Sequence, residues 1–267
     1  KYPVVIKADG LALGKGVLIC QNEQEAADGV KEIMLDKKFG ASGNHVVVEE
    51  FLTGPEVSVL SFCDGKTVKP MVSSMDHKRA LDHDEGLNTG GMGTVAPNPY
   101  YTPAVAERCM QEIFLPTVAA MQAEGCPFKG CLYFGLMLTP DGPKVIEYNC
   151  RFGDPETQVV LPLLESDLLT VMEATTNGTL DKTEVKFSDG AAACVILASA
   201  DVTVYHAGTA IKDGSLVTNG GRVLGVTATA NTLPEALKKA YAATESVHFD
   251  KLHKRSDIGA RALAAMQ

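Results

Sequence analysis

The sequence predicts an α+β fold, and three observations indicate it. Apolar runs of strand length come in pairs joined by glycine-rich or Asp-Gly turns, which is typical of antiparallel hairpins. Segments with helix-capping residues and helical periodicity separate these pairs. After residue 185 the composition changes, and short strands with two further helices predict a second, small α+β domain.

The first 72 residues predict two hairpins and one helix. A glycine-rich turn over residues 9–16 separates the first two strands, and Asp64-Gly65 forms the turn of the second hairpin. Asn22 and Glu25 have capping-box spacing before a helical run. The strands are expected at residues 3–7, 17–20 and 46–48, with the further hairpin over 55–72.

Residues 76–99 are polar and glycine-rich and predict a long loop, which in a compact domain is usually functional or disordered. Thr102 with Pro103 begins a helix to about Glu124, bent or broken near Pro116. The next elements are expected as strands over 130–138 and 144–148 and a helix from Ser166 to about Thr176, which Gly178 ends.

The last 80 or so residues predict three short strands and two helices. Thr232 with Glu235 caps the first helix, and the last helix begins at Asp257. The strands are expected over 192–197, 202–206 and 222–229.

Composition limits the possible partners. The 267 residues are enough for two domains, and 45% hydrophobic residues is ordinary for a soluble globular protein. The 24 basic and 33 acidic residues give a net charge of −9, which disfavours nucleic acid as a partner. No apolar run approaches the roughly 20 residues needed to cross a bilayer, so we expect no membrane partner and a cytoplasmic protein. The abrupt start at Lys1, without Met and directly before a strand, predicts a piece of a larger protein.

The seven cysteines predict reduced thiols. No two of them form a CxxC pair, and most lie in apolar or strand-like runs, so neither a zinc site nor a disulfide framework is indicated. They stand at positions 20, 63, 109, 126, 131, 150 and 194.

The end of the expected strand 144–148 is the most informative part of the chain. Glu147 and Asn149 alternate with Tyr148, so their side chains point to the same side, and two oxygen ligands there suit Mg²⁺. Arg151, two residues further on, is expected on the same side and can bind a phosphate or carboxylate through two parallel hydrogen bonds. A surface strand end with ordinary ion pairs is the alternative interpretation.

The glycine-rich turn contains Gly10, Gly14, Lys15 and Gly16 but lacks the G-x4-G-K-[ST] spacing of a P-loop, and a strand follows it instead of a helix. A glycine-rich hairpin can still fold over phosphates, because its backbone N–H groups approach closely and Lys15 adds a charge. A plain β-turn is the alternative.

Lys7 ends an apolar strand, where it is either a side chain that reaches to water or a second phosphate ligand. The segment 49–56 leaves one strand and enters another. The backbone N–H and C=O groups of this segment can form hydrogen bonds with the edge of an adenine, and a carboxylate further along can bind ribose hydroxyls. A solvated strand end is the alternative interpretation.

Residues 76–79, Asp-His-Lys-Arg, and the Asn-Thr-Gly-Gly-Met-Gly segment 88–93 offer cations and open backbone donors on one stretch of chain, which suits an anionic substrate. A solvated charge run is the alternative, and His77 alone is a weak indication of catalysis. The sequence contains no GxSxG or HExxH motif, so hydrolase and metalloprotease functions have no support.

Four segments together resemble the ATP-grasp enzymes and, within them, the glycinamide ribonucleotide synthetases, or phosphoribosylamine-glycine ligases. The resemblance covers nearly the whole chain and continues through His206–Thr209 and Thr218–Leu224; RFGDPE with NTGGMG is its most specific part. The segments are VVIKADGLALGKGV (4–17), VVEEFLTGPEVS (47–58), DHKRALDHDEGLNTGGMG (76–93) and VIEYNCRFGDPETQ (145–158).

The resemblance implies ATP held between two α+β lobes, residues 1–54 and 55–185, followed by a small C-terminal domain, 186–267. In that family Lys7 and Lys15 would touch phosphates, and Glu147 with Asn149 would hold Mg²⁺ (or Mn²⁺). The ATP-binding residues implied are Lys7, Gly14, Lys15, Gly16, Glu49, Glu50, Leu52 and Glu56, of which Glu49 to Leu52 would read adenine and Glu56 would bind ribose.

The family's reaction has the glycine carboxylate attack the γ-phosphate of ATP, and the amine of 5-phosphoribosylamine then attacks the glycyl phosphate. The resemblance implies that Arg151 stabilises the acyl phosphate and that Asp154 holds an amino group of a substrate. The substrate-binding residues implied are Lys78, Asn88, Gly90, Gly91, Gly93, Glu156, Gly208, Thr209 and Arg222.

Two departures from the family pattern are visible. The family's N-terminal domain and the first part of its central domain are absent, and the missing part contributes to the phosphoribosylamine site. The resemblance therefore implies that turnover needs this missing part, and we expect the missing domain as a partner of this chain. Ala198–Ala200 also runs directly into Asp201-Val202, where the family has a longer connection containing glycine.

Two other functions stay open. Another ATP-grasp carboxylate-amine ligase would share the ATP and metal residues but differ at NTGGMG and RFGDPE. A nucleotide-binding module without turnover is the other. Glycine-dependent ADP formation with phosphoribosylamine separates these possibilities.

Overall fold

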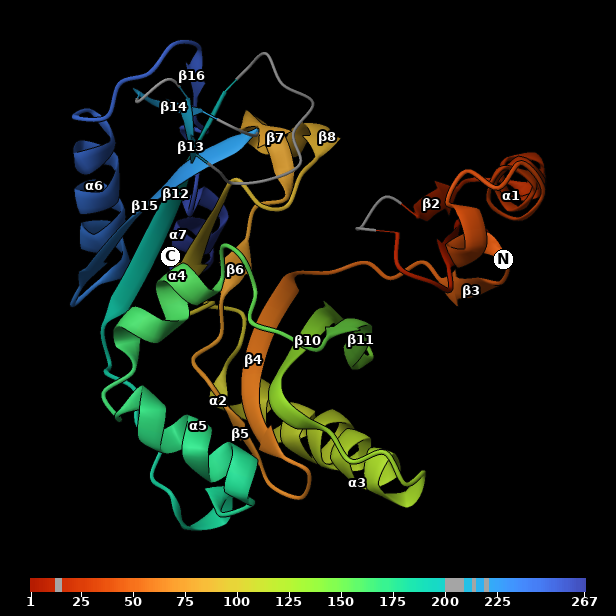
Figure 1. Ribbon diagram of the computed structural model, residues 1–267, viewed down its shortest axis with the longest axis horizontal. Helices are drawn as coiled ribbons and strands as arrows, with labels where there is room; N and C mark the ends of the chain where they lie inside the picture. The colour runs from red at the N-terminus through yellow and green to blue at the C-terminus, as the bar shows by residue number, and fades with distance from the viewer. Residues whose placement is uncertain (13–15, 200–208, 213–214, 219–220) are drawn as a thin grey trace. The chain divides into compact units, whose positions relative to one another are not determined.

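The computed structural model describes residues 1–12, 16–199, 209–212, 215–218 and 221–267 (Figure 1). The chain divides into two compact units, Lys1–Thr53 and Gly54–Gln267. The predicted strand 202–206 lies wholly outside the described residues, and the short connection after Ala198 lies mostly outside them.

The first unit is a three-stranded antiparallel sheet with one helix. The expected capping by Asn22 is confirmed, since its side chain accepts the backbone N–H of Glu25. The return bond differs from that of a capping box, because the Glu25 carboxylate accepts the N–H of Gln21, at 2.8 Å, instead of that of Asn22. The core of the unit contains Ile6 and Ile33. Its elements are β1 (Val4–Ala8), β2 (Val17–Cys20), α1 (Glu23–Val30), a π-helical turn (Lys31–Leu35), a 3-10 turn (Gly40–Gly43) and β3 (Val46–Glu50), in the sheet order β2-β1-β3.

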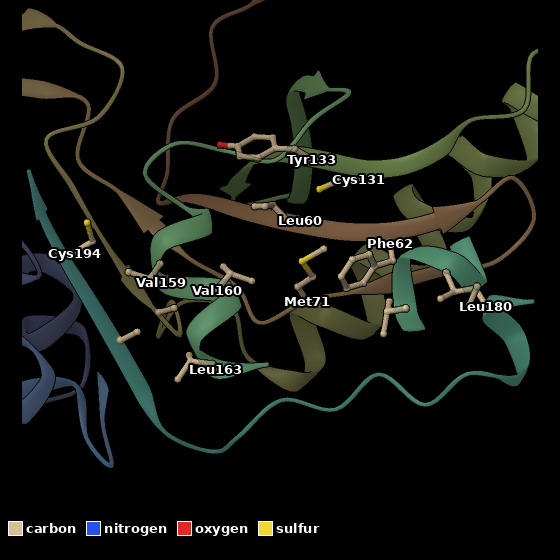
Figure 2. Packing of buried hydrophobic residues seen from close by; sticks show 14 of the residues in the cluster. Leu60, Phe62, Met71, Cys131, Tyr133, Val159, Val160, Leu163, Leu180 and Cys194 are labelled. Carbon is tan, nitrogen blue, oxygen red and sulfur yellow. The ribbon is translucent and has the colours of Figure 1, made fainter. Parts of the chain in front are cut away.

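The second unit contains two larger antiparallel sheets. The first has the order β11-β10-β4-β5, and side chains of β10 alternate between two hydrophobic clusters, because successive residues of a strand face opposite ways. Cys131 and Tyr133 face the cluster under α5, which Figure 2 shows, and Leu132 and Phe134 face the cluster under α2 and α3. The elements are β4 (Glu56–Asp64), β5 (Val68–Pro70), α2 (Pro103–Cys109), α3 (Leu115–Ala123), β10 (Lys129–Thr139), β11 (Gly142–Asn149) and α5 (Leu168–Asn177).

The second sheet joins strands that are distant in sequence. Its order is β15-β12-β9-β6, with β16 also paired to β12, so two short strands from before residue 100 complete the sheet of the C-terminal residues. The helix α6 packs on β12 and β15 (Figure 1). The elements are β6 (Met75–Asp76), β9 (Gly93–Ala96), β12 (Ala191–Ser199), β15 (Arg222–Ala230), α6 (Leu233–Thr244), β16 (Leu252–His253) and α7 (Ala260–Ala265).

The expectation of a loop over residues 76–99 is wrong. The segment holds β6, β9 and a hairpin of its own, β7 (Arg79–Leu81) with β8 (Glu85–Asn88). These strands are two to four residues long, too short to produce a visible alternation of apolar and polar residues.

The helix that begins after Thr102 ends about where expected, and two other predicted helix boundaries need correction. Residues 103–123 are helical throughout, with a π-helical turn at Met110–Phe114 just before Pro116, which has no N–H to donate. Asp167, not Ser166, caps α5, since its Oδ1 accepts the N–H of Thr170 at 2.7 Å. The last helix begins at Ala260 instead of Asp257, whose carboxylate is bound to Arg255.

Other expectations are confirmed. Thr102 caps α2, and Gly178 ends α5 with a left-handed φ of 73°. The seven cysteines are free thiols, with only Cys126 and Cys150 exposed. Not expected were α4 (Thr157–Val160) and the hairpin of β13 (Thr209–Lys212) with β14 (Ser215–Thr218). Within the described ranges, every helix is too short or too polar to span a bilayer.

Candidate active site

The end of β11 places Glu147 and Asn149 together. The register puts Glu147 opposite Gly135 of β10, and Asn149 Nδ2 lies 3.4 Å from Glu147 Oε1, so the two side chains share one side of the strand, as expected. Among the described residues no three His, Cys, Asp or Glu side chains converge on a metal position. A cation bound to the side-chain oxygens of Glu147 and Asn149 would therefore need further oxygens from water or a ligand, which is how Mg²⁺ usually binds beside phosphates.

Arg151 is exposed just beyond the strand. Its Nη1 donates to the carbonyl oxygen of Phe152 at 2.8 Å, which anchors one prong of the guanidinium. The rest of the exposed guanidinium is accessible to an anion.

Asp154 is bound on both carboxylate oxygens. Oδ2 accepts from Arg222 Nη2 at 3.0 Å, and Oδ1 accepts from Gln158 Nε2 at 2.7 Å. Arg222, the buried first residue of β15, also directs Nη1 at the carbonyl oxygens of Asp154 (3.3 Å) and Gly91 (3.4 Å). Arg222 thus fastens the loop after β11 to the segment 88–93, and both Asp154 oxygens are already engaged within the protein.

The glycines of segment 88–93 are required by close packing. A Cβ on Gly91, whose φ is +120°, would lie 2.4 Å from Pro155 Cδ, and one on Gly90 would lie 2.7 Å from Arg222 Nη2. Gly93 is buried in β9, where a Cβ would lie 2.7 Å from a methyl carbon of Ile258. Asn88 and Gly90 are exposed, so they remain the accessible members of this segment.

Lys78 lies next to acidic side chains. Its Nζ donates to Glu56 Oε2 at 2.9 Å. Burial lowers the pKa of Lys78, but the carboxylates of Glu56, Asp76 and Glu147 outweigh it and raise that pKa above its usual value. The site therefore contains a permanent cation.

Two further carboxyl groups lie near this cation, the buried Glu156 and the half-buried Asp76. Asp76 Oδ1 accepts the N–H of His77 at 2.7 Å, and burial together with the charge of Glu156 raises the pKa of Asp76 well above its usual value. Glu156 Oε1 accepts from the hydroxyl of Tyr133 at 3.1 Å, and burial raises the Glu156 pKa. The Tyr133 hydroxyl, which also contacts Ser58 Oγ at 2.8 Å, points away from the hydrophobic side chains (Figure 2).

His77 is a buried packing residue. Its Nδ1 lies 3.1 Å from the carbonyl of Gly93, and its Nε2 accepts the N–H of Gly259 at 3.1 Å, so the ring is neutral with its proton on Nδ1. Burial, with the charges of Arg261 and Arg255, lowers the His77 pKa to about 4.

Sequence reasoning did not single out Asp76, Tyr133 or Ser58. Tyr133 stands in an apolar strand, where a tyrosine is read as core, and its partners come from other elements. Only the parity of β10 could have placed Tyr133 with Cys131 on one face.

In the first unit Lys7 and Glu49 form an ion pair, Nζ to Oε2, of 2.6 Å across β1 and β3. Glu50 ends β3 exposed, and Leu52 follows half-buried. Gly16 is buried, and its carbonyl oxygen accepts the N–H of Ala8 at 2.8 Å. Gly14, Lys15 and Gly208 lie outside the described residues, and of Thr209 only the backbone, at the start of β13, is described.

Two family models match the chain. The ATP-grasp (A) domain of phosphoribosylglycinamide synthetase matches residues 1–157, and the C domain of the same enzyme matches residues 186–261. The chain belongs to the phosphoribosylglycinamide synthetase family. The expected ATP-grasp fold is thereby confirmed, and the family is one of ligases.

Named relatives agree with this membership. A phosphoribosylamine–glycine ligase of Vibrio vulnificus is 46% identical over 287 residues, covering 99% of this chain and 67% of that protein. A bifunctional purine biosynthetic protein of Schizosaccharomyces pombe is 47% identical over 283 residues, 98% of this chain and 36% of that protein. The crystal structure of a phosphoribosylamine–glycine ligase from Thermotoga maritima matches with a TM-score of 0.88 at 36% identity, over 97% of this chain and 69% of that one. The chain thus spans about two thirds of the single-function relatives and about a third of the bifunctional one.

Proposed function

We propose that the protein to which this chain belongs ligates glycine to 5-phosphoribosylamine, converting ATP to ADP and phosphate through glycyl phosphate. The observation that carries the proposal is the strand end of β11, where Glu147 and Asn149 share one side and Arg151 follows exposed. The relatives named as phosphoribosylamine–glycine ligases support the choice of substrates.

We assign Glu147 and Asn149 to a divalent cation, Mg²⁺ or Mn²⁺. Both offer oxygen atoms, which hard cations prefer, and two protein ligands leave coordination positions for phosphate oxygens and water. When bound, such a cation neutralises charge on the phosphates of the nucleotide.

Arg151 stabilises the negative charge that develops on the transferred phosphoryl group and on glycyl phosphate. Phosphoryl transfer depends mainly on positioning and charge neutralisation, which a guanidinium supplies without covalent chemistry. Asp154 acts differently from the role implied by resemblance. Because Arg222 and Gln158 engage both of its carboxylate oxygens, we assign Asp154 to holding the loop in place.

The solvent exposure of the side chains decides which residues we propose for contact with the substrate. Lys78, a permanent cation, and the exposed Asn88 and Gly90 are the candidates for the phosphate of phosphoribosylamine. Glu156 is buried and accepts a hydrogen bond from Tyr133, so we assign it to holding Tyr133 in place and not to contact with the substrate. Three further assignments rest on the sequence alone. They are a cytoplasmic location, substrate contacts of Gly208 and Thr209, and ATP binding by Lys7, Gly14, Lys15, Gly16, Glu49, Glu50, Leu52 and Glu56. We also propose that residues of the protein outside this chain complete the phosphoribosylamine site, since the single-function relatives are about half as long again.

The test is ADP formation by the complete protein with glycine and freshly generated phosphoribosylamine, each omitted in turn. We expect repeated turnover to ADP only when both are present with Mg²⁺. ADP formation that needs a different acid or amine would indicate another carboxylate-amine ligase, and nucleotide binding without ADP formation would indicate a binding module. Either outcome contradicts the proposal.

A further inference from the structure

The segment from His77 to Asp84 is bound along its length by residues 253–261, which we call the C-terminal strap. His253 Nε2 lies 2.8 Å from the carbonyl oxygen of Ala80, and Asp82 accepts the N–H of Ser256 at 2.8 Å. These contacts join parts of the chain more than 170 residues apart. No role in the proposed reaction accounts for them.

Arg255 is the centre of these contacts. Its side chain is 1% exposed, and Nε and Nη2 each donate to one oxygen of Asp257 at 2.7 Å. Nη1 donates to Asp84 Oδ1 at 2.9 Å and to the carbonyl oxygen of Arg79 at 3.2 Å. A guanidinium removed from water needs such a full set of acceptors, and here two of them belong to the β7–β8 hairpin.

The hairpin turn held in this way has an unfavourable backbone. His83 and Asp84 have φ values of 60° and 57°, in the left-handed region that costs energy for residues other than glycine. Asp84 is held there by two arginines, Arg255 and, at 3.2 Å from its other oxygen, Arg261. The N–H of His83 is bound by Asp257 Oδ2 at 2.9 Å. The strap therefore determines the shape of the hairpin tip.

The base of the same hairpin carries the candidate substrate contacts. The carbonyl oxygen of Lys78 accepts both the N–H and the hydroxyl of Thr89, at 2.8 and 2.9 Å, so Lys78 and the segment 88–91 are fixed to one another. A shift of the hairpin moves both together. The hydrogen bonds and ion pairs of Arg255 go to Asp257, Asp84 and the carbonyl oxygen of Arg79, so Arg255 acts on Lys78 and the segment 88–91 through the hairpin.

We propose that Arg255 is a positioning residue for phosphoribosylamine: by fixing the β7–β8 hairpin on the C-terminal strap, it holds Lys78 and residues 88–91 in their binding arrangement. The inference deepens the proposed function and rests on it for the identity of the substrate. The assignment of Arg255 to the order of the hairpin does not depend on any substrate.

The experiment uses the complete protein and three variants. Arg255→Lys keeps the charge but loses the fork that reaches Asp257 and Asp84 at once. Asp84→Asn weakens the contacts of the hairpin tip to Arg255 and Arg261 and leaves the pair of Arg255 with Asp257 in place. Arg108→Lys is the control, because Arg108 of α2 forms a bidentate pair with Glu112 of the following π-helical turn, and both side chains are exposed. Hydrogen exchange over residues 79–91 is measured without substrates, and KM for phosphoribosylamine, KM for ATP and kcat are measured separately.

We expect Arg255→Lys and Asp84→Asn to speed exchange over residues 79–91 and to raise KM for phosphoribosylamine on the order of ten-fold, while KM for ATP changes less than about two-fold. Arg108→Lys should change none of these. Should Arg255→Lys fail to fold, Asp84→Asn decides, since it leaves Arg255 paired with Asp257.

Unchanged exchange in both variants would overturn the inference. So would faster exchange with an unchanged KM for phosphoribosylamine, because the contacts would then be structural only, and so would a parallel rise of KM for ATP. If the unaltered protein shows no turnover that depends on phosphoribosylamine, the proposed function fails. The exchange comparison would still decide whether Arg255 orders the hairpin.

Discussion

Glu147 is the residue whose replacement tests the cation site. It is exposed, so Glu147→Ala should leave the melting temperature of the nucleotide-free protein nearly unchanged, while Mg²⁺-dependent ADP formation falls below detection. Glu124→Ala, which removes an exposed carboxylate at the end of α3, is the control. Full turnover of a folded Glu147→Ala protein at saturating Mg²⁺ would exclude Glu147 as a metal ligand.

Arg151 is expected to act on the transition state more than on the bound nucleotide. Arg151→Lys keeps the charge but removes the planar fork, so kcat should fall about ten-fold or more, as loss of a charge-assisted contact of roughly 1.5 to 3 kcal/mol implies. Steady-state kinetics with saturating glycine and phosphoribosylamine measure it. An unchanged kcat with a raised KM for ATP would make Arg151 a ligand of the ground state only.

We predict that the unfolding free energy depends on pH through the protonation of His77. Burial and the charges of Arg261 and Arg255 lower its pKa in the folded protein from the ordinary 6.5 to about 4. The hydrogen bond to Gly93 and the charge of Asp84 act in the opposite direction. The unfolded chain therefore binds the proton first, and stability falls as pH decreases from about 6.5 toward 4, by up to about 3 kcal/mol.

His77→Gln should remove this part of the pH dependence, measured as the urea unfolding free energy between pH 4.5 and 7.5. His248→Gln, at an exposed position of the same unit, should leave it intact. An identical pH profile for the unaltered protein and His77→Gln would show that the His77 proton is not linked to unfolding.

The sequence could predict only those parts of the candidate site that depend on the alternation of side chains along a single strand. Glu147 and Asn149 are two residues apart on one strand, and their expected proximity is confirmed. Asp76 and Tyr133 come from different sheets, and no short-range pattern connects them.

At the scale of single elements, hairpins and helix ends with strong turn residues were predicted correctly. Asp64-Gly65 makes the expected turn, in which Asp64 Oδ1 accepts the N–H groups of Lys66 and Thr67. The hairpin of β7 and β8 was missed because its turn residues, His83 and Asp84, adopt positive φ through contacts with the strap. Such tertiary contacts leave no local signal.

Gly178 gives a prediction about a helix end. Its φ of 73° suits glycine, and a Cβ would find its nearest neighbour only at 3.8 Å, so the backbone conformation alone opposes a side chain. Gly178→Ala should lower the unfolding free energy by about 1 kcal/mol, and Gly178→Asn by less, since asparagine tolerates this region. Urea unfolding compares the two. Equal stability of Gly178→Ala and the unaltered protein would contradict the assignment of strain.

At the scale of the whole molecule, the α+β class and the ATP-grasp fold were evident from motifs, but the pairing of the second sheet was not. β9 pairs β12 with Val195 opposite Gly93, so a strand next to the candidate substrate segment belongs to the sheet of the C-terminal residues. Pairings this distant in sequence depend on the packing of the whole unit, here on α6 and the strap. They also explain how a C-terminal residue, Arg222, contacts the loop after β11.

The central claim, ligation through glycyl phosphate, is tested most directly by oxygen transfer. Glycine labelled with ¹⁸O in its carboxylate is incubated with ATP, Mg²⁺, phosphoribosylamine and the complete protein, and the inorganic phosphate is analysed by mass spectrometry. Attack of the carboxylate on the γ-phosphate places a glycine oxygen in the bridge to phosphorus, and that oxygen leaves with phosphate when the amine attacks the carbonyl carbon. We predict one ¹⁸O atom in each phosphate released with glycinamide ribonucleotide, and unlabelled phosphate accompanying product formation would contradict the account.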